Sequence, residues 1–227
     1  MKKKVLTLRI ILSLLIVVLC LWFDFNTYKP QSKSIPCEDH GIIFSITTFD
    51  GKTESKPFVR CLGHTWVSID NQSGHSVRLK DHEIKNDEII TFSVWAVSGH
   101  RGLFFNLESN FIIQYDRYVG RQSLSINIDE SKLRTIEDYI EDHHNWTLVK
   151  NCSCWAIQLW NQVVDEDYQL KTQTLVYTPQ RLQKSMREYD CTETNRDFSR
   201  SGGIFYYQDG FGKEWQLCSP KKESCVS

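Results

Sequence analysis

The chain lacks an excess of charge of either sign, since its 227 residues include 27 basic and 28 acidic ones. No run of basic residues follows the three lysines at its start, so the composition does not indicate nucleic-acid binding. Its histidines do not recur at metal-ligand spacing, and the adjacent pair His143-His144 suits the C-terminal end of a helix instead. We therefore predict no metal and no other cofactor.

The apolar run near the N-terminus lacks the small residues of a signal-peptidase cleavage site. Residues 1–25 combine a cluster of lysines with an apolar stretch from Val5 to Phe25, which is close to the length that spans a bilayer. Because positive charge stays on the cytoplasmic side, we expect a single-pass signal anchor in the cytoplasmic membrane, with the rest of the chain on the outer, periplasmic or extracellular, side. Secretion after cleavage is the alternative.

The rest of the chain shows neither internal repeats nor low-complexity tracts, so one domain is expected. Residues 26–36 are polar and contain two prolines, which is typical of a short tether. Residues 37–227 are long enough to bury one substantial core.

The chain has eight cysteines, a number that suggests disulfides if the chain is exported. None of them forms a CxxC pair. Leaving out Cys20 in the apolar run gives an odd number, which leaves one thiol free, and we predict that this is Cys152. The other six could form three disulfides, and Cys218 and Cys225 could pair with each other or with Cys191. The six are Cys37, Cys61, Cys154, Cys191, Cys218 and Cys225.

The stretch from Asn151 to Asn161 predicts a cysteine at the start of a helix. Apolar residues such as Trp155, Leu159 and Val163 recur there at helical spacing. A thiol at a helix N-terminus lies near unpaired backbone N–H groups and the positive end of the dipole, and both favour the reactive thiolate. Cys152 and Cys154 point to opposite sides of a helix, and Cys152 is the predicted nucleophile because it is nearer the start.

The base for this nucleophile is predicted to be His64. In the segment from His64 to Asp70, alternation places Thr65, Val67 and Ile69 on one side of a strand and His64 on the other. An imidazole on a sheet that faces a thiol at a helix N-terminus is the working geometry of Cys-His hydrolases.

Taken together, the segments Gly63–Ile69, Thr91–Ala96 and Trp146–Cys152 resemble the circularly permuted branch of the NlpC/P60 papain-like superfamily, over roughly residues 42–164. The resemblance implies an antiparallel sheet with the nucleophile helix packed on it, Cys152 as nucleophile after Asn151, and His64 as base. It also implies acyl-transfer chemistry. Members cut amide bonds in peptidoglycan stem peptides, and others act on lipid acyl groups or as thioesterases.

The third, orienting residue stays open. A hairpin at residues 71–74 would place His75 near Asp70, about 20 Å along the strand from His64, and Asp81 or His82 opposite His64. Pairing of the His64 strand with residues 91–95 would offer Thr91 or Ser93 instead. His100, which follows the strand expected at residues 89–97, could also line a cleft.

The remaining pattern predicts an α+β fold. Strands are expected at residues 42–48, 89–97, 123–128 and 205–208, a helix at 130–144 capped by Asp129, and a helix from Pro179 to about Tyr189. Residues 103–118 have no clean period and are expected to form a loop.

The sequence therefore suggests two functions that can be tested. The first is a Cys-His hydrolase or acyltransferase, with a cell-wall peptide amidase or endopeptidase favoured and a peptidoglycan, peptide or lipid acyl substrate. The alternative is a catalytically inactive, membrane-anchored binding or immunity-type domain on the same scaffold.

Overall fold

The structure is a computed structural model that describes residues 33–51, 63–97, 100–145, 151–170, 177–187, 189 and 192–206. Over this part of the chain an antiparallel sheet packs against helices, so the α+β prediction is confirmed. The anchor expected at residues 1–25 lies outside the described ranges. Inside them, no helix combines the length and the apolar character that crossing a bilayer requires.

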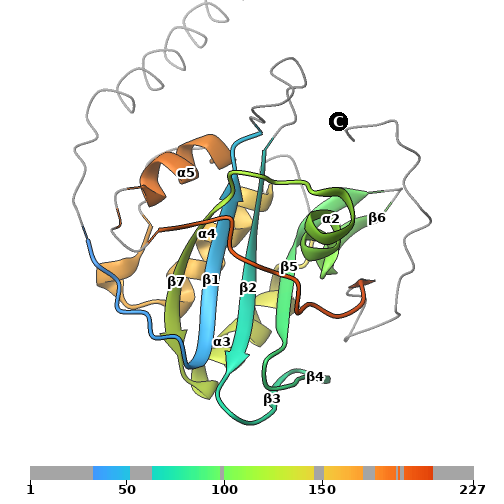
Figure 1. The fold of residues 1–227 in the computed structure, drawn as a ribbon, viewed down its shortest axis with the longest axis vertical. Helices are drawn as coiled ribbons and strands as arrows, with labels where there is room; N and C mark the ends of the chain where they lie inside the picture. Colours follow the sequence, from blue (N-terminus) through green and yellow to red (C-terminus); the bar gives the residue numbers. More distant parts are fainter. Residues whose placement is uncertain are drawn as a thin grey trace, which may run out of the picture.

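The sheet has seven strands in the order β8-β7-β1-β2-β5-β6-β9, and its neighbouring strands run antiparallel. Its longest strands, β1, β2 and β5, lie side by side at its centre (Figure 1). The strands of this sheet are β1 (Gly41–Phe49), β2 (His64–Gln72), β5 (Ile89–Val97), β6 (His100–Phe105), β7 (Gln122–Ile128), β8 (Glu193–Thr194) and β9 (Phe205–Tyr206).

One face of the sheet is apolar and forms the main core. Alternate strand residues, such as Phe44 and Phe92, point to this face and are fully buried. The helices α3 (Glu130–Asp142) and α4 (Cys152–Val163) cover it, and α5 (Pro179–Met186) packs against β1 and β7. In Figure 1, α3 and α4 lie behind the sheet. The core therefore holds α4 at a fixed position on the strands.

Of the two pairings left open for the His64 strand, the structure shows the one with residues 91–95. The strand β2 pairs with β5, with Val67 opposite Phe92, and not with the residues that directly follow the turn. Those residues form a separate two-stranded hairpin of β3 (Val77–Leu79) and β4 (His82–Ile84). Asp81 and His82 consequently do not lie opposite His64.

The loop prediction for residues 103–118 is wrong. This stretch contains the end of β6 and the helix α2 (Leu107–Tyr115). The helix follows Asn106, which adopts a left-handed backbone (φ 58°) and makes no side-chain cap hydrogen bond. Its side chain instead accepts a hydrogen bond from the Thr91 N–H and donates one to the Gly203 carbonyl, both at 3.0 Å. Tertiary contacts, which a sequence period does not reveal, thus fix the start of α2.

The second face of the sheet is polar over β1 and β7. The Ser45 and Ser125 hydroxyls share a hydrogen bond of 2.8 Å, and the Thr47 and Ser123 hydroxyls share another of 2.8 Å. Residues 192–206 cross in front of this face in Figure 1. We call this stretch the crossing segment.

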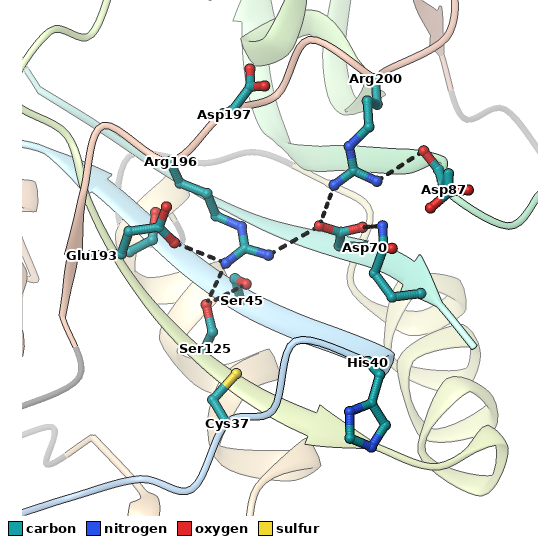
Figure 2. A network of polar contacts seen from close by, with 12 residues as sticks. Cys37, His40, Ser45, Asp70, Asp87, Ser125, Glu193, Arg196, Asp197 and Arg200 are labelled. Atoms are coloured by element: carbon teal, nitrogen blue, oxygen red, sulfur yellow. Dashed lines mark hydrogen bonds and ion pairs between the residues drawn. The ribbon is translucent and has the colours of Figure 1, made fainter. Parts of the chain in front are cut away.

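A buried ion cluster fastens the crossing segment to β2 (Figure 2). Asp70 Oδ2 accepts hydrogen bonds from Arg196 at 3.1 Å and from Arg200 at 2.7 Å. Arg196 also reaches Ser125 and Glu193, and its side chain is largely buried. The end of β2 remote from His64 therefore carries a carboxylate held by two guanidinium groups.

Candidate active site

Cys152 is the first residue of α4. The helix begins there because Asn151 has an extended backbone and its side-chain oxygen accepts a hydrogen bond from the Cys154 N–H at 3.0 Å. The Asn151 amide also donates to the Tyr177 carbonyl at 3.1 Å. Cys152 is partly exposed as a residue, and its thiol lies in the first turn, where the helix dipole favours negative charge.

His64 is the first residue of β2, and the structure brings its imidazole close enough to the Cys152 thiol for each group to shift the pKa of the other. The imidazole is buried, with 6% of the residue exposed. Burial on its own lowers the pKa of an imidazole, but the Cys152 thiolate and the Glu108 carboxylate outweigh it and raise the pKa of His64 to about 9. The two residues predicted as nucleophile and base therefore meet across the end of the sheet.

The surroundings of Cys152 favour its thiolate. Burial raises the pKa of a thiol, but the charge and hydrogen bond of His64 exceed that effect and lower the pKa of Cys152. Polar contacts from Thr65 and Ser153 lower the pKa of Cys152 further. An imidazolium and a thiolate are the charge state that these contacts support.

A chain of buried hydroxyls holds the start of α4 against the sheet. Ser153 Oγ lies 2.9 Å from Thr65 Oγ1, which lies 3.1 Å from Thr48 Oγ1. Thr48 Oγ1 also donates to the Pro179 carbonyl at 3.2 Å. These contacts join β1, β2, α4 and the start of α5, so the thiol is fixed relative to His64 from several directions.

The third polar residue of the site is Glu108, in the first turn of α2. It is fully buried, and its Oε1 accepts a hydrogen bond from His64 Nε2 at 3.0 Å. The Trp95 indole N–H donates to the same oxygen at 2.5 Å, and the Thr91 hydroxyl donates to Oε2 at 3.3 Å. Because Nε2 is occupied by Glu108, the ring nitrogen left for the thiol is Nδ1.

Sequence reasoning missed Glu108 because residues 103–118 were expected to form a loop. A usable signal was present: a single carboxylate, Glu108, stands between the apolar residues Leu107 and Phe111. A charged residue in such a setting is buried only when it is paired, which makes it a candidate for a site.

The earlier candidates for the third residue lie elsewhere or act indirectly. Thr91 bonds to Glu108 and not to the imidazole, and the Ser93 hydroxyl donates to the Thr65 carbonyl at 2.8 Å. His75 is exposed and pairs with Glu130. Asp81 and His82 belong to the β3–β4 hairpin, and His100 opens β6.

Cys154 is a free thiol, so it does not join a disulfide as the cysteine count suggested. Its side chain packs against the main core, as expected for the opposite side of α4. Cys152 is also free. Cys61, Cys191, Cys218 and Cys225 lie outside the described residues, so the disulfide pairing stays a prediction. Within the described ranges no three His, Cys, Asp or Glu side chains gather as potential metal ligands.

No family model matches the chain, and comparisons with curated proteins and with solved structures likewise return no significant match.

Proposed function

We propose that this protein is a cysteine hydrolase or acyltransferase in which Cys152, His64 and Glu108 act as one unit. One observation carries the proposal: the thiol of a partly exposed cysteine at a helix start lies beside a buried imidazole, whose Nε2 is held by a buried carboxylate. A nucleophile, its base and an orienting group in that order are the signature of covalent acyl transfer.

In the proposed acylation step the Cys152 thiolate attacks an acyl carbon and forms a tetrahedral intermediate. Backbone N–H groups at the start of α4, with that of Cys152 first among them, stabilise the oxyanion. The His64 imidazolium then gives its proton to the leaving group, and the C–S bond of the acyl-enzyme remains. Glu108 keeps the ring oriented throughout.

In the proposed release step a water molecule attacks the thioester. His64, now neutral, takes the proton of the water, and the Cys152 sulfur departs as thiolate. An amine or alcohol in place of water would give acyl transfer. The same residues serve both outcomes, so the acceptor decides between hydrolase and transferase.

The substrate class comes from the resemblance to the permuted NlpC/P60 branch, whose papain-like fold we also propose for this domain. The α+β sheet with the Cys152 helix packed on it supports that assignment. A domain held on the outer side of the cytoplasmic membrane by residues 1–25 would meet peptidoglycan, and we propose a stem-peptide amide as the bond cut.

The test uses the full chain with purified peptidoglycan and measures released muropeptides by chromatography and mass spectrometry. The wild type should release them, and Cys152→Ala and His64→Ala should not. Cys154→Ala is the matched control, because it removes a thiol from the same helix turn on the side that faces the core. It should retain release.

Release by Cys152→Ala would contradict the proposal. A wild type that binds the wall without releasing fragments would favour the inactive binding or immunity-type domain.

A further inference from the structure

The indole of Trp95 makes two contacts with the proposed catalytic unit. Its Nε1 donates a hydrogen bond of 2.5 Å to Glu108 Oε1, the same oxygen that accepts His64 Nε2 at 3.0 Å. Its ring also lies against the imidazole, with 3.8 Å between ring centroids and 40° between the planes. One side chain on β5 therefore holds both the carboxylate and the imidazole.

The donor is chemically suited to this position. An indole N–H only donates and does not titrate, so Trp95 can hold the Glu108 oxygen at every working pH without exchanging protons with His64. Two donors on one oxygen also share its charge, so the bond from Trp95 weakens the hold of Glu108 on the imidazolium.

A second tryptophan beside the same imidazole provides a comparison. Trp66 stacks with His64 at 5.9 Å between centroids, but its fully buried indole N–H has no hydrogen-bond partner within the described part of the chain. Trp66 thus contributes ring packing alone, whereas Trp95 contributes ring packing and a hydrogen bond.

We propose that Trp95 is a positioning residue that sets the proton affinity of the His64–Glu108 pair through its indole N–H and fixes the ring plane of His64 by direct packing. The proposal rests on the proposed function, because it assigns Trp95 a part in the Cys152 unit. Trp95 does not touch the reacting sulfur in this scheme and acts through its two partners.

The experiment follows carboxymethylation of Cys152 by iodoacetate from pH 4 to 11 in the full chain, read by mass spectrometry of the peptide. Iodoacetate is an anion, so its reaction is fastest when the thiolate is accompanied by an imidazolium. The rate should fall on the alkaline side when His64 loses its proton. No knowledge of the natural substrate is needed.

Trp95→Phe keeps an aromatic ring and removes the N–H. The Glu108 oxygen then has His64 as its main donor, so the imidazolium should hold its proton to higher pH, and the alkaline limb should rise by about half to one pH unit. Trp66→Phe removes an N–H without a partner, and its alkaline limb should stay at the wild-type position.

An alkaline limb that stays or falls in Trp95→Phe, or one that moves equally in both variants, overturns the proposal. If Trp95→Phe does not fold, site-specific replacement by benzothienylalanine, which keeps the bicyclic shape and exchanges the N–H for sulfur, makes the same comparison. The wild-type arm is separate: a wild type with no reactive thiolate below pH 7 would refute the proposed function itself.

Discussion

Two carboxylates are buried on the polar face of the sheet, one beside each end of β2, and they have different partners. Glu108 faces the imidazole of His64, which in turn faces a thiol. Asp70 faces the guanidinium groups of Arg196 and Arg200. Both carboxylates are closed off from solvent, with side-chain exposures of 0% and 5%.

The difference teaches which buried charge can do chemistry. A guanidinium keeps its proton at any working pH, so the Asp70 cluster can join segments but cannot transfer a proton. An imidazole, unlike a guanidinium, can release and regain its proton in the working pH range, and the Glu108 cluster also offers a nucleophile. Both sites therefore contain a buried carboxylate. Its partner, a guanidinium or an imidazole, determines whether the site only joins segments of the chain or can also transfer a proton.

Removing the titratable partner should give the largest effect. His64→Gln keeps a polar side chain but cannot accept and return a proton, so the rate of muropeptide release should fall about 10²–10⁴-fold. The matched control is His75→Gln, which changes an exposed histidine paired with Glu130. It should keep the wild-type rate, and equal losses in the two variants would contradict the comparison.

Breaking the other cluster should cost stability and leave the thiol chemistry intact. Asp70→Asn removes the charge between Arg196 and Arg200 and should lower the free energy of unfolding by about 3 kcal/mol, measured by urea denaturation. Glu193→Gln removes the half-exposed partner of Arg196 and should cost less than about 1 kcal/mol. The comparison fails if Asp70→Asn abolishes the reactivity of Cys152 in the folded protein.

The charge of Glu108 should affect how the reaction rate of Cys152 with iodoacetate depends on pH. The pKa of His64 is raised to about 9, partly by the charge of Glu108, so the wild-type reaction with iodoacetate should decline near pH 9. Glu108→Gln removes that charge, and the decline should move down by about one pH unit. A decline that stays near pH 9 would mean that the thiolate alone supports the imidazolium.

The smallest effect should come from the helix caps. Asn151→Ala and Asp129→Ala each remove a side-chain cap, from α4 and α3 respectively, and each should lower the free energy of unfolding by about 1 kcal/mol. Only Asn151→Ala should also slow the reaction of Cys152 at pH 6, because α4 carries the thiol. Equal reactivity in the two variants would show that the cap has no part in the site.

The sequence allowed prediction of those features that local pattern encodes. Alternation around His64 and helical spacing after Cys152 placed each residue correctly on its element, and Asp129 and Pro179 marked helix starts that the structure bears out. Each of these signals lies within a few residues of the feature that it predicts.

Glu108 could not be placed in the same way. The helix that carries it begins at Asn106 through bonds to Thr91 and Gly203, which are distant in the chain. The pairing of β2 with β5 likewise skips the β3–β4 hairpin, so the neighbour of His64 depended on a register that no local signal gives. Contacts between distant segments therefore decide both the position of Glu108 and the choice between the two pairings of the His64 strand.

The enclosure of His64 has a consequence for proton accounting. With 6% of the residue exposed, the ring is surrounded by Trp66, Trp95 and Tyr118 and offers hardly any aqueous exit on that side. In the proposed reaction the proton of the His64 imidazolium therefore passes directly to the leaving group and not to the solvent. Amide acylation should then proceed without a burst of acidification in a weakly buffered solution.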